Sequence, residues 1–256
     1  MGTMEFQRMN DAYREKKYPK GSVFERNTGK NRNNSIILLV LLAIVAAALA
    51  AGLIFFMDLI QYHQLSGNSD EVTVGYVFVG IFVVLLALCV LGLVFCVKNM
   101  KKGVDAIMAA SAKASGLTIE DIRAFDQQAL QSDSYILKLK NAVSAAMANQ
   151  ADGILTRDYL WLGDFGNHIM RRGDIVGACL YQWSYYVNRK RIWALSVAVV
   201  NRQNMAITAE VSPESGAALL GLLHRDQPEI VVAPEVLREG KDYDNWRASV
   251  TGGAKV

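Results

Sequence analysis

Cysteine and histidine are scarce in this sequence, and neither is spaced as a metal site or a redox centre requires. The 256 residues include three cysteines, with Cys89 and Cys96 inside an apolar run and Cys179 standing alone. The three histidines are scattered, at His63, His168 and His224. No CxxC pair and no HExxH motif is present. We therefore expect reduced thiols, no metal site and no cofactor.

Sequence signatures of common enzyme families are also missing. There is no GxxxxGK[ST] loop, no GxGxxG after a strand and no GxSxG elbow. His168, Asp174 and Cys179 share one stretch, HIMRRGDIVGACLYQW. Asp174 and Cys179 are five residues apart in an expected strand, so their side chains point to opposite faces, and His168 precedes the Arg-Gly-Asp turn. The sequence predicts a small buried Cys179 and a protein that is not an enzyme.

Charge is absent from two long apolar runs, residues 35–57 and 72–97. Each run exceeds the roughly 20 helical residues that cross a hydrocarbon layer. A polar segment of 34 residues precedes the first run, which indicates an uncleaved anchor rather than a secretory signal. Small residues recur on one face of each run and would allow close helix packing. The sequence predicts a transmembrane hairpin over residues 35–97.

Lysine and arginine are absent from the connection between the two runs, residues 58–71. Eight basic residues precede the first run: Arg8, Arg14, Lys16, Lys17, Lys20, Arg26, Lys30 and Arg32. Four more follow the second run: Lys98, Lys101, Lys102 and Lys113. The positive-inside rule then predicts a multi-pass cell-membrane protein with both termini in the cytoplasm. The net charge of +3 reflects this orientation, so we expect membrane lipids, including anionic headgroups, as partners and no nucleic acid.

The regions beside the apolar runs differ in pattern. Residues 1–34 mix charges, Asn and Gly without an apolar period, which predicts a disordered basic arm in the cytosol. Residues 98–150 predict juxtamembrane helices, with a new helix capped by Thr118 and Asp121 and with QSDS at 131–134 as a break. An apolar stripe on these helices would permit self-association, although no heptad repeat is present.

From residue 151 the apolar pattern has a period of two. Strands are expected at 154–162, 175–183, 192–200 and 205–211, with turn-rich connections between them. A helix should follow, with Ser212 as its N-cap and Pro213 in its first turn. We expect an α+β domain over residues 151–234, an antiparallel meander closed by this helix, and a loose tail over 235–256.

The order ILTRDYLWLG, GDIVGACLY, two further strands, a helix and DQPEIVVA resembles the pleckstrin-homology-like (PH-like) domain of certain bacterial membrane proteins. The resemblance covers roughly residues 150–234 together with the helices before it. It implies a curved sheet that is closed by a helix and binds other molecules, and it implies no reaction. The first strand pair lacks the spaced Lys and Arg of the lipid-reading members, so phosphoinositide recognition is not implied.

One basic cluster remains as a candidate contact for lipid or a protein partner, the turn of Arg189, Lys190 and Arg191. A solvated turn is the simpler alternative for such a cluster. Two functions stay open. The first is a non-enzymatic, membrane-anchored cytosolic interaction, sensory or scaffold module. The second is an accessory subunit of a larger membrane complex, such as a transporter or envelope machine.

Overall fold

The computed structural model describes residues 6–67, 69–139, 152–163 and 167–252. The chain divides into two compact units, each of which is described by itself. A helical-hairpin unit comprises residues 25–106, and an α+β unit comprises residues 1–24 and 107–256.

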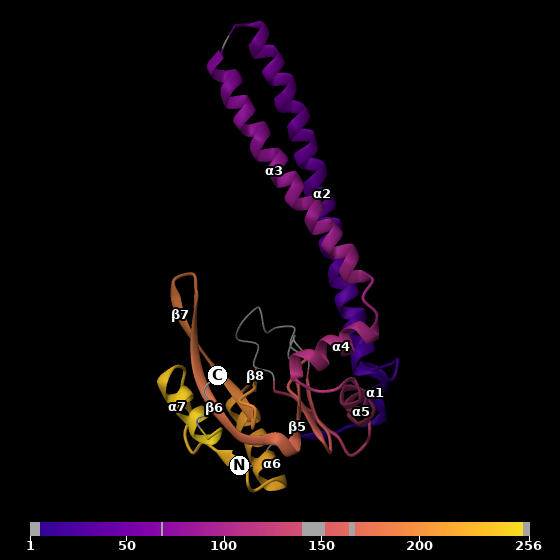
Figure 1. Ribbon diagram of the computed structural model, residues 1–256, viewed down its shortest axis with the longest axis vertical. Coiled ribbons are helices and arrows are strands. Elements are labelled where there is room, and N and C mark those ends of the chain that lie inside the picture. Colours follow the sequence, from indigo (N-terminus) through magenta and orange to yellow (C-terminus); the bar gives the residue numbers. More distant parts are fainter. Residues whose placement is uncertain (1–5, 68, 140–151, 164–166, 253–256) are drawn as a thin grey trace. The chain divides into compact units, whose positions relative to one another are not determined.

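Two long antiparallel helices, α2 (Val23–Leu65) and α3 (Ser69–Met100), make the helical-hairpin unit (Figure 1). Their segments Ser35–Leu65 and Ser69–Met100 are long and apolar enough to cross a membrane, and they contain both predicted runs. At 1.5 Å per residue, the 31 residues of the first segment extend about 46 Å, against a hydrocarbon layer of about 30 Å. The two apolar helices predicted from the sequence are confirmed.

Glycines let these two helices approach closely. A Cβ atom added to Gly52 would lie 2.5 Å from the ring of Phe82, and one added to Gly75 would lie 2.5 Å from Ile60. Most of the large apolar side chains elsewhere on the pair are exposed, Ile54 and Leu91 each by 66%. Small residues therefore serve helix contact, as predicted, and the outer surface suits an apolar solvent.

The N-terminal segment is folded in its described part, so the expected disordered arm of residues 1–34 is wrong there. Strand β1 (Gln7–Arg8) pairs antiparallel with β2 (Tyr135–Leu137), and helix α1 (Asp11–Lys17) follows it. Phe24, at the start of α2, is 1% exposed. The elements that bury the apolar residues of this segment are more than 100 residues away in the sequence. The segment therefore shows no local apolar periodicity from which its fold could be predicted.

Helices α4 (Val104–Ser115) and α5 (Ile119–Ala129) follow α3, as predicted. Gly116 follows the last residue of α4 and has a φ of +64°, a left-handed backbone conformation that favours glycine. The predicted cap is confirmed, because the Thr118 hydroxyl accepts from the Asp121 amide and the Asp121 carboxylate accepts from the Thr118 amide.

Two element predictions in the next region are wrong. Residues 135–137, expected in a helix, form strand β2. The expected single strand at 154–162 is a hairpin of two short strands, because Thr156 and Tyr159 bond to each other across a tight turn. The rest of the predicted helix, residues 140–150, lies outside the described residues.

The α+β unit has two sheets joined by the short 3₁₀ helix η1 (Arg172–Asp174). The first sheet has the antiparallel order β1-β2-β3-β4-β5, with β3 (Gly153–Leu155), β4 (Tyr159–Trp161) and β5 (Ile169–Arg171). The second has the order β10-β6-β7-β8, with β6 (Ile175–Val187), β7 (Lys190–Asn201), β8 (Ala206–Glu210) and β10 (Leu237–Arg238). Strand β9 (Val231–Val232) pairs parallel with β6, whereas β6, β7 and β8 form the antiparallel meander predicted for the last three of its four strands. The prediction of a single meander is wrong for residues 154–162, which belong to the first sheet.

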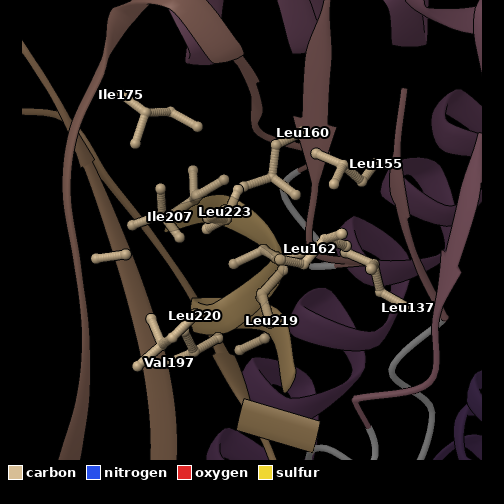
Figure 2. Packing of buried hydrophobic residues seen from close by; sticks show 14 of the residues in the cluster. Leu137, Leu155, Leu160, Leu162, Ile175, Val197, Ile207, Leu219, Leu220 and Leu223 are labelled. Carbon is tan, nitrogen blue, oxygen red and sulfur yellow. The ribbon is translucent and has the colours of Figure 1, made fainter. Parts of the chain in front are cut away.

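Helix α6 (Pro213–Asp226) closes the core between the sheets (Figure 2). Its Ser212 cap is confirmed, since the Ser212 hydroxyl accepts from the Ser215 amide at 3.1 Å. Leu219 and Leu223 are fully buried against residues of both sheets. Burying one such leucine contributes about 1.5–3 kcal/mol, so α6 is central to the stability of this unit.

The other face of the second sheet is covered by helix α7 (Lys241–Val250), so the expectation of a loose tail over 235–256 is wrong for residues 241–250, and also for strand β10 at residues 237–238. Tyr243 and Trp246 of α7 pack on Cys179 and on Ala198, both of which are fully buried. These two aromatic residues are the main apolar contacts of a helix that is otherwise polar, which is too sparse a pattern to predict it from sequence.

Candidate functional site

The predicted basic residues lie at the tip of the β6–β7 hairpin. Val187 pairs with Lys190, so Asn188 and Arg189 form a two-residue turn, with φ of 48° and 65°. Positive φ at both central residues is the geometry of a type I′ turn, in which Asn is favoured first and Gly second. Arg189 stands where glycine would be least strained, at a backbone cost of about 1 kcal/mol.

The outer part of this hairpin is a ribbon of two strands. Five residue pairs, from Trp183↔Ala194 to Val187↔Lys190, extend past the rest of the sheet (Figure 1). The β8 pairing begins at Ser196, and the β10 pairing reaches only Gln182. In the described part of the chain, no third strand supports these five pairs. We call residues 183–194 the hairpin tip.

Aromatic side chains, which sequence reasoning did not single out, lie on both faces of the hairpin tip. On one face the rings of Trp183 and Tyr185 lie 5.2 Å apart. On the other face Tyr186 and Trp193 are 71% and 48% exposed. The guanidinium of Arg191 stacks over Trp193 at 4.2 Å from the ring centroid. The signal was present in the sequence as WSYYV and IW on either side of the basic turn.

The charge of the hairpin tip is not neutralised by its own residues. Residues 183–194 include Arg189, Lys190 and Arg191 and no Asp or Glu. Glu239 follows β10, whose pairing with β6 ends at Gln182, one residue before the tip. The Glu239 amide donates to the Gln182 carbonyl at 2.9 Å. The tip therefore combines a cluster of positive charge with exposed aromatic surface.

A second feature is a charged cleft of about 580 Å³ beside η1. It is lined by Asp121, Arg157, Asp158, Tyr159, Arg171, Arg172, Gly173, Asp174 and Gln227. These residues come from α5, the β3–β4 turn, β4, β5, η1 and the end of α6. It gathers several ionisable groups, as a site for proton transfer would.

Asp121 is the best-connected carboxylate of the charged cleft. Arg171 donates to both of its oxygens at 2.7 Å, and the Tyr159 hydroxyl donates at 2.9 Å. Burial alone would raise the pKa of Asp121, but the bonds from Arg171, Thr118 and Tyr159 outweigh it and hold the pKa at about 2. A carboxyl that ionises so readily is a poor general acid or base near neutral pH, so its bonds serve the fold.

The other arginines of the charged cleft are also paired. Arg157 bonds to Asp158 at 3.1 Å, and this hydrogen bond lowers the pKa of Asp158. Arg172 bonds to Asp226 at 3.1 Å and donates to the Thr156 carbonyl. Each arginine of the cleft thus has a carboxylate partner, and these bonds link α5, the first sheet and α6.

His168 and Cys179, which share the stretch HIMRRGDIVGACLYQW, are not brought into one site. His168 precedes β5 in the first sheet, whereas Cys179 lies in β6 of the second. Burial raises the pKa of the Cys179 thiol to about 12, so the thiolate is rare at neutral pH. Cys179 packs as the small buried residue that the sequence predicted.

No group of three or more His, Cys, Asp or Glu side chains in the described residues could hold a metal ion. No protein-family model, no curated protein and no solved structure matches this chain.

Proposed function

We propose that this protein is a membrane-anchored interaction module without enzymatic activity. Helices α2 and α3 span the cell membrane, both termini are cytoplasmic, and the α+β unit offers its surfaces to other molecules. The observation that carries the proposal is the pair of long apolar helices with outward-facing apolar side chains, in a chain that also builds a separate α+β unit.

The orientation follows from charge. The connection between α2 and α3 has no Lys or Arg, whereas basic residues stand on the other side of both apolar segments. Basic residues near span ends are retained on the cytoplasmic side. The α+β unit, which contains both chain ends, would then be cytosolic.

The proposal includes a PH-like character for the α+β unit. Support comes from the antiparallel meander of β6, β7 and β8 followed by helix α6, which packs on it, as the sequence resemblance implies for its sheet and closing helix. A binding role is favoured over catalysis, because Asp121 and Cys179 have pKa values of about 2 and about 12, far from the range of proton transfer at neutral pH.

Isolation of the tagged full-length chain from membranes in mild detergent, followed by mass spectrometry, tests this function. We expect the chain to resist alkaline extraction and to co-purify with a cytosolic protein or with lipid, or to self-associate. Extraction at alkaline pH would contradict the anchor. Stoichiometric recovery with other integral membrane proteins would favour the accessory-subunit alternative.

A further inference from the structure

We propose that the hairpin tip, residues 183–194, binds the surface of an anionic lipid bilayer. This inference rests on the proposed function, because it takes the chain to be held at a membrane by α2 and α3. The two spans then supply the α+β unit at a high effective concentration near lipid, so that a weak contact is enough.

Charge is the first argument for this occupant. The hairpin tip carries three basic residues and no acidic one. Basic side chains near an anionic leaflet each strengthen binding by about 1 kcal/mol, so three of them shift the bound-to-free ratio on the order of 100-fold. The charged cleft has as many arginines, but each of them already pairs with a carboxylate.

The exposed aromatic residues give the second argument. Trp and Tyr favour the boundary between headgroups and hydrocarbon, because one end of each ring is apolar and the other is polar. Tyr186 and Trp193 are exposed on the same face of the tip, and Arg191 stacks over Trp193. This pairing brings a cation and an aromatic ring to the same depth, as a headgroup layer requires.

The backbone gives the third argument. Arg189 has a φ of 65° at a turn position where glycine would relieve the strain. A strained residue at an exposed tip, with no packing that demands a large side chain, indicates a use for that side chain outside the fold.

A second copy of the chain is a less suitable occupant, although the bare strand edges of the ribbon could pair. Pairing two tips would bring six cations together without an acidic residue from either tip. An anionic bilayer instead supplies the missing charge. The aromatic surface would also be only partly covered in a narrow edge-to-edge contact.

The test uses the full-length chain in lipid nanodiscs. Cys89, Cys96 and Cys179 are changed to alanine, and Val187→Cys at the tip carries an environment-sensitive fluorophore. Discs contain phosphatidylcholine alone or phosphatidylcholine with phosphatidylserine, and quenching by brominated lipid reports contact of the label with the bilayer. The tip variant combines Arg189→Gln, Lys190→Gln and Arg191→Gln. The matched control combines Arg202→Gln, Arg225→Gln and Lys241→Gln, three exposed basic residues away from the tip.

We expect quenching in discs with phosphatidylserine, a bound-to-free ratio lowered on the order of 100-fold in the tip variant, and no change in the control variant. Absence of quenching, or equal quenching in neutral discs and in the tip variant, would overturn the inference. Self-quenching between labels without lipid quenching would overturn it in favour of a second copy. Each of these failures leaves the interaction module standing if alkaline extraction does not remove the chain from the membrane.

Discussion

The charged cleft and the hairpin tip belong to the same α+β unit and carry equal numbers of basic residues. The cleft has Arg157, Arg171 and Arg172, and the tip has Arg189, Lys190 and Arg191. In the cleft each arginine bonds to a carboxylate. Among the residues that the structure describes, the cations of the tip contact an aromatic ring and a serine hydroxyl and no carboxylate. The partner of a cation, rather than the number of cations, therefore separates a stabilising network from a contact surface.

The largest expected change in stability comes from removing the carboxylate at the centre of the charged cleft. Asp121→Asn should lower the free energy of unfolding of the α+β unit by about 3 kcal/mol, because it leaves Arg171 without its carboxylate. All four tryptophans, Trp161, Trp183, Trp193 and Trp246, lie in this unit. Their fluorescence during urea unfolding of the full chain in mild detergent therefore measures the change.

Two controls accompany this measurement. Asp174→Asn, in the same cleft, should change the free energy of unfolding by less than about 0.5 kcal/mol. The triple glutamine variant of the tip should cost less than about 1 kcal/mol, because its cations serve no buried pair. A tip variant as unstable as Asp121→Asn would remove the distinction between the two regions.

Acid should destabilise the charged cleft and leave the hairpin tip unaffected. The pKa of Asp121 in the folded state is about 2, below its ordinary value of 3.8. A lowered pKa contributes stability above about pH 4 that is lost as the pH falls through 2. After allowance for solvent screening, the loss is on the order of 1–2 kcal/mol. Urea titrations across this range should give a flatter profile for Asp121→Asn and an unchanged one for the triple tip variant.

Arg189→Gly should stabilise the α+β unit by about 1 kcal/mol, because glycine adopts the positive φ of this turn position without the cost that a side chain brings. The same change removes one cation from the tip and should weaken lipid contact. Urea unfolding and the nanodisc assay, measured on one variant, should therefore move in opposite directions. A destabilised Arg189→Gly protein would contradict the strain at this turn.

The smallest expected effect concerns the ribbon itself. Arg191→Ala should lower the free energy of unfolding by about 0.5 kcal/mol, since it removes an exposed cation–π contact with Trp193. Arg191→Lys keeps a cation and should recover part of this loss. Equal stability of the alanine and lysine variants would mean that the ring contact contributes nothing to the ribbon.

Elements with strong local patterns could be predicted from the sequence. The two apolar helices, the meander of β6 to β8 and the capped helix α6 each carry their signal within a few consecutive turns or strands. Strands β1 and β2 and helix α7 could not be predicted, because they are short and are stabilised by distant segments. For example, Gln7 pairs with Ile136.

The same physical reason explains why the basic turn of the hairpin tip could be predicted from the sequence and the charged cleft could not. The basic triplet at residues 189–191 is consecutive, and a turn between two strands could be predicted around it. Asp121 and Arg171 are 50 residues apart and come from a helix and a strand of different segments. No local pattern connects them, so Asp121 could be predicted as a helix cap but not as the carboxylate of Arg171.

A photo-reactive residue placed in native membranes tests the central claim most directly. We would compare the full-length chain with the probe at Tyr186, on the hairpin tip, and at Arg157, an equally exposed position in the charged cleft. We expect phospholipid cross-links at position 186 and none above background at position 157. Equal phospholipid labelling at both positions, or none at position 186, would contradict it.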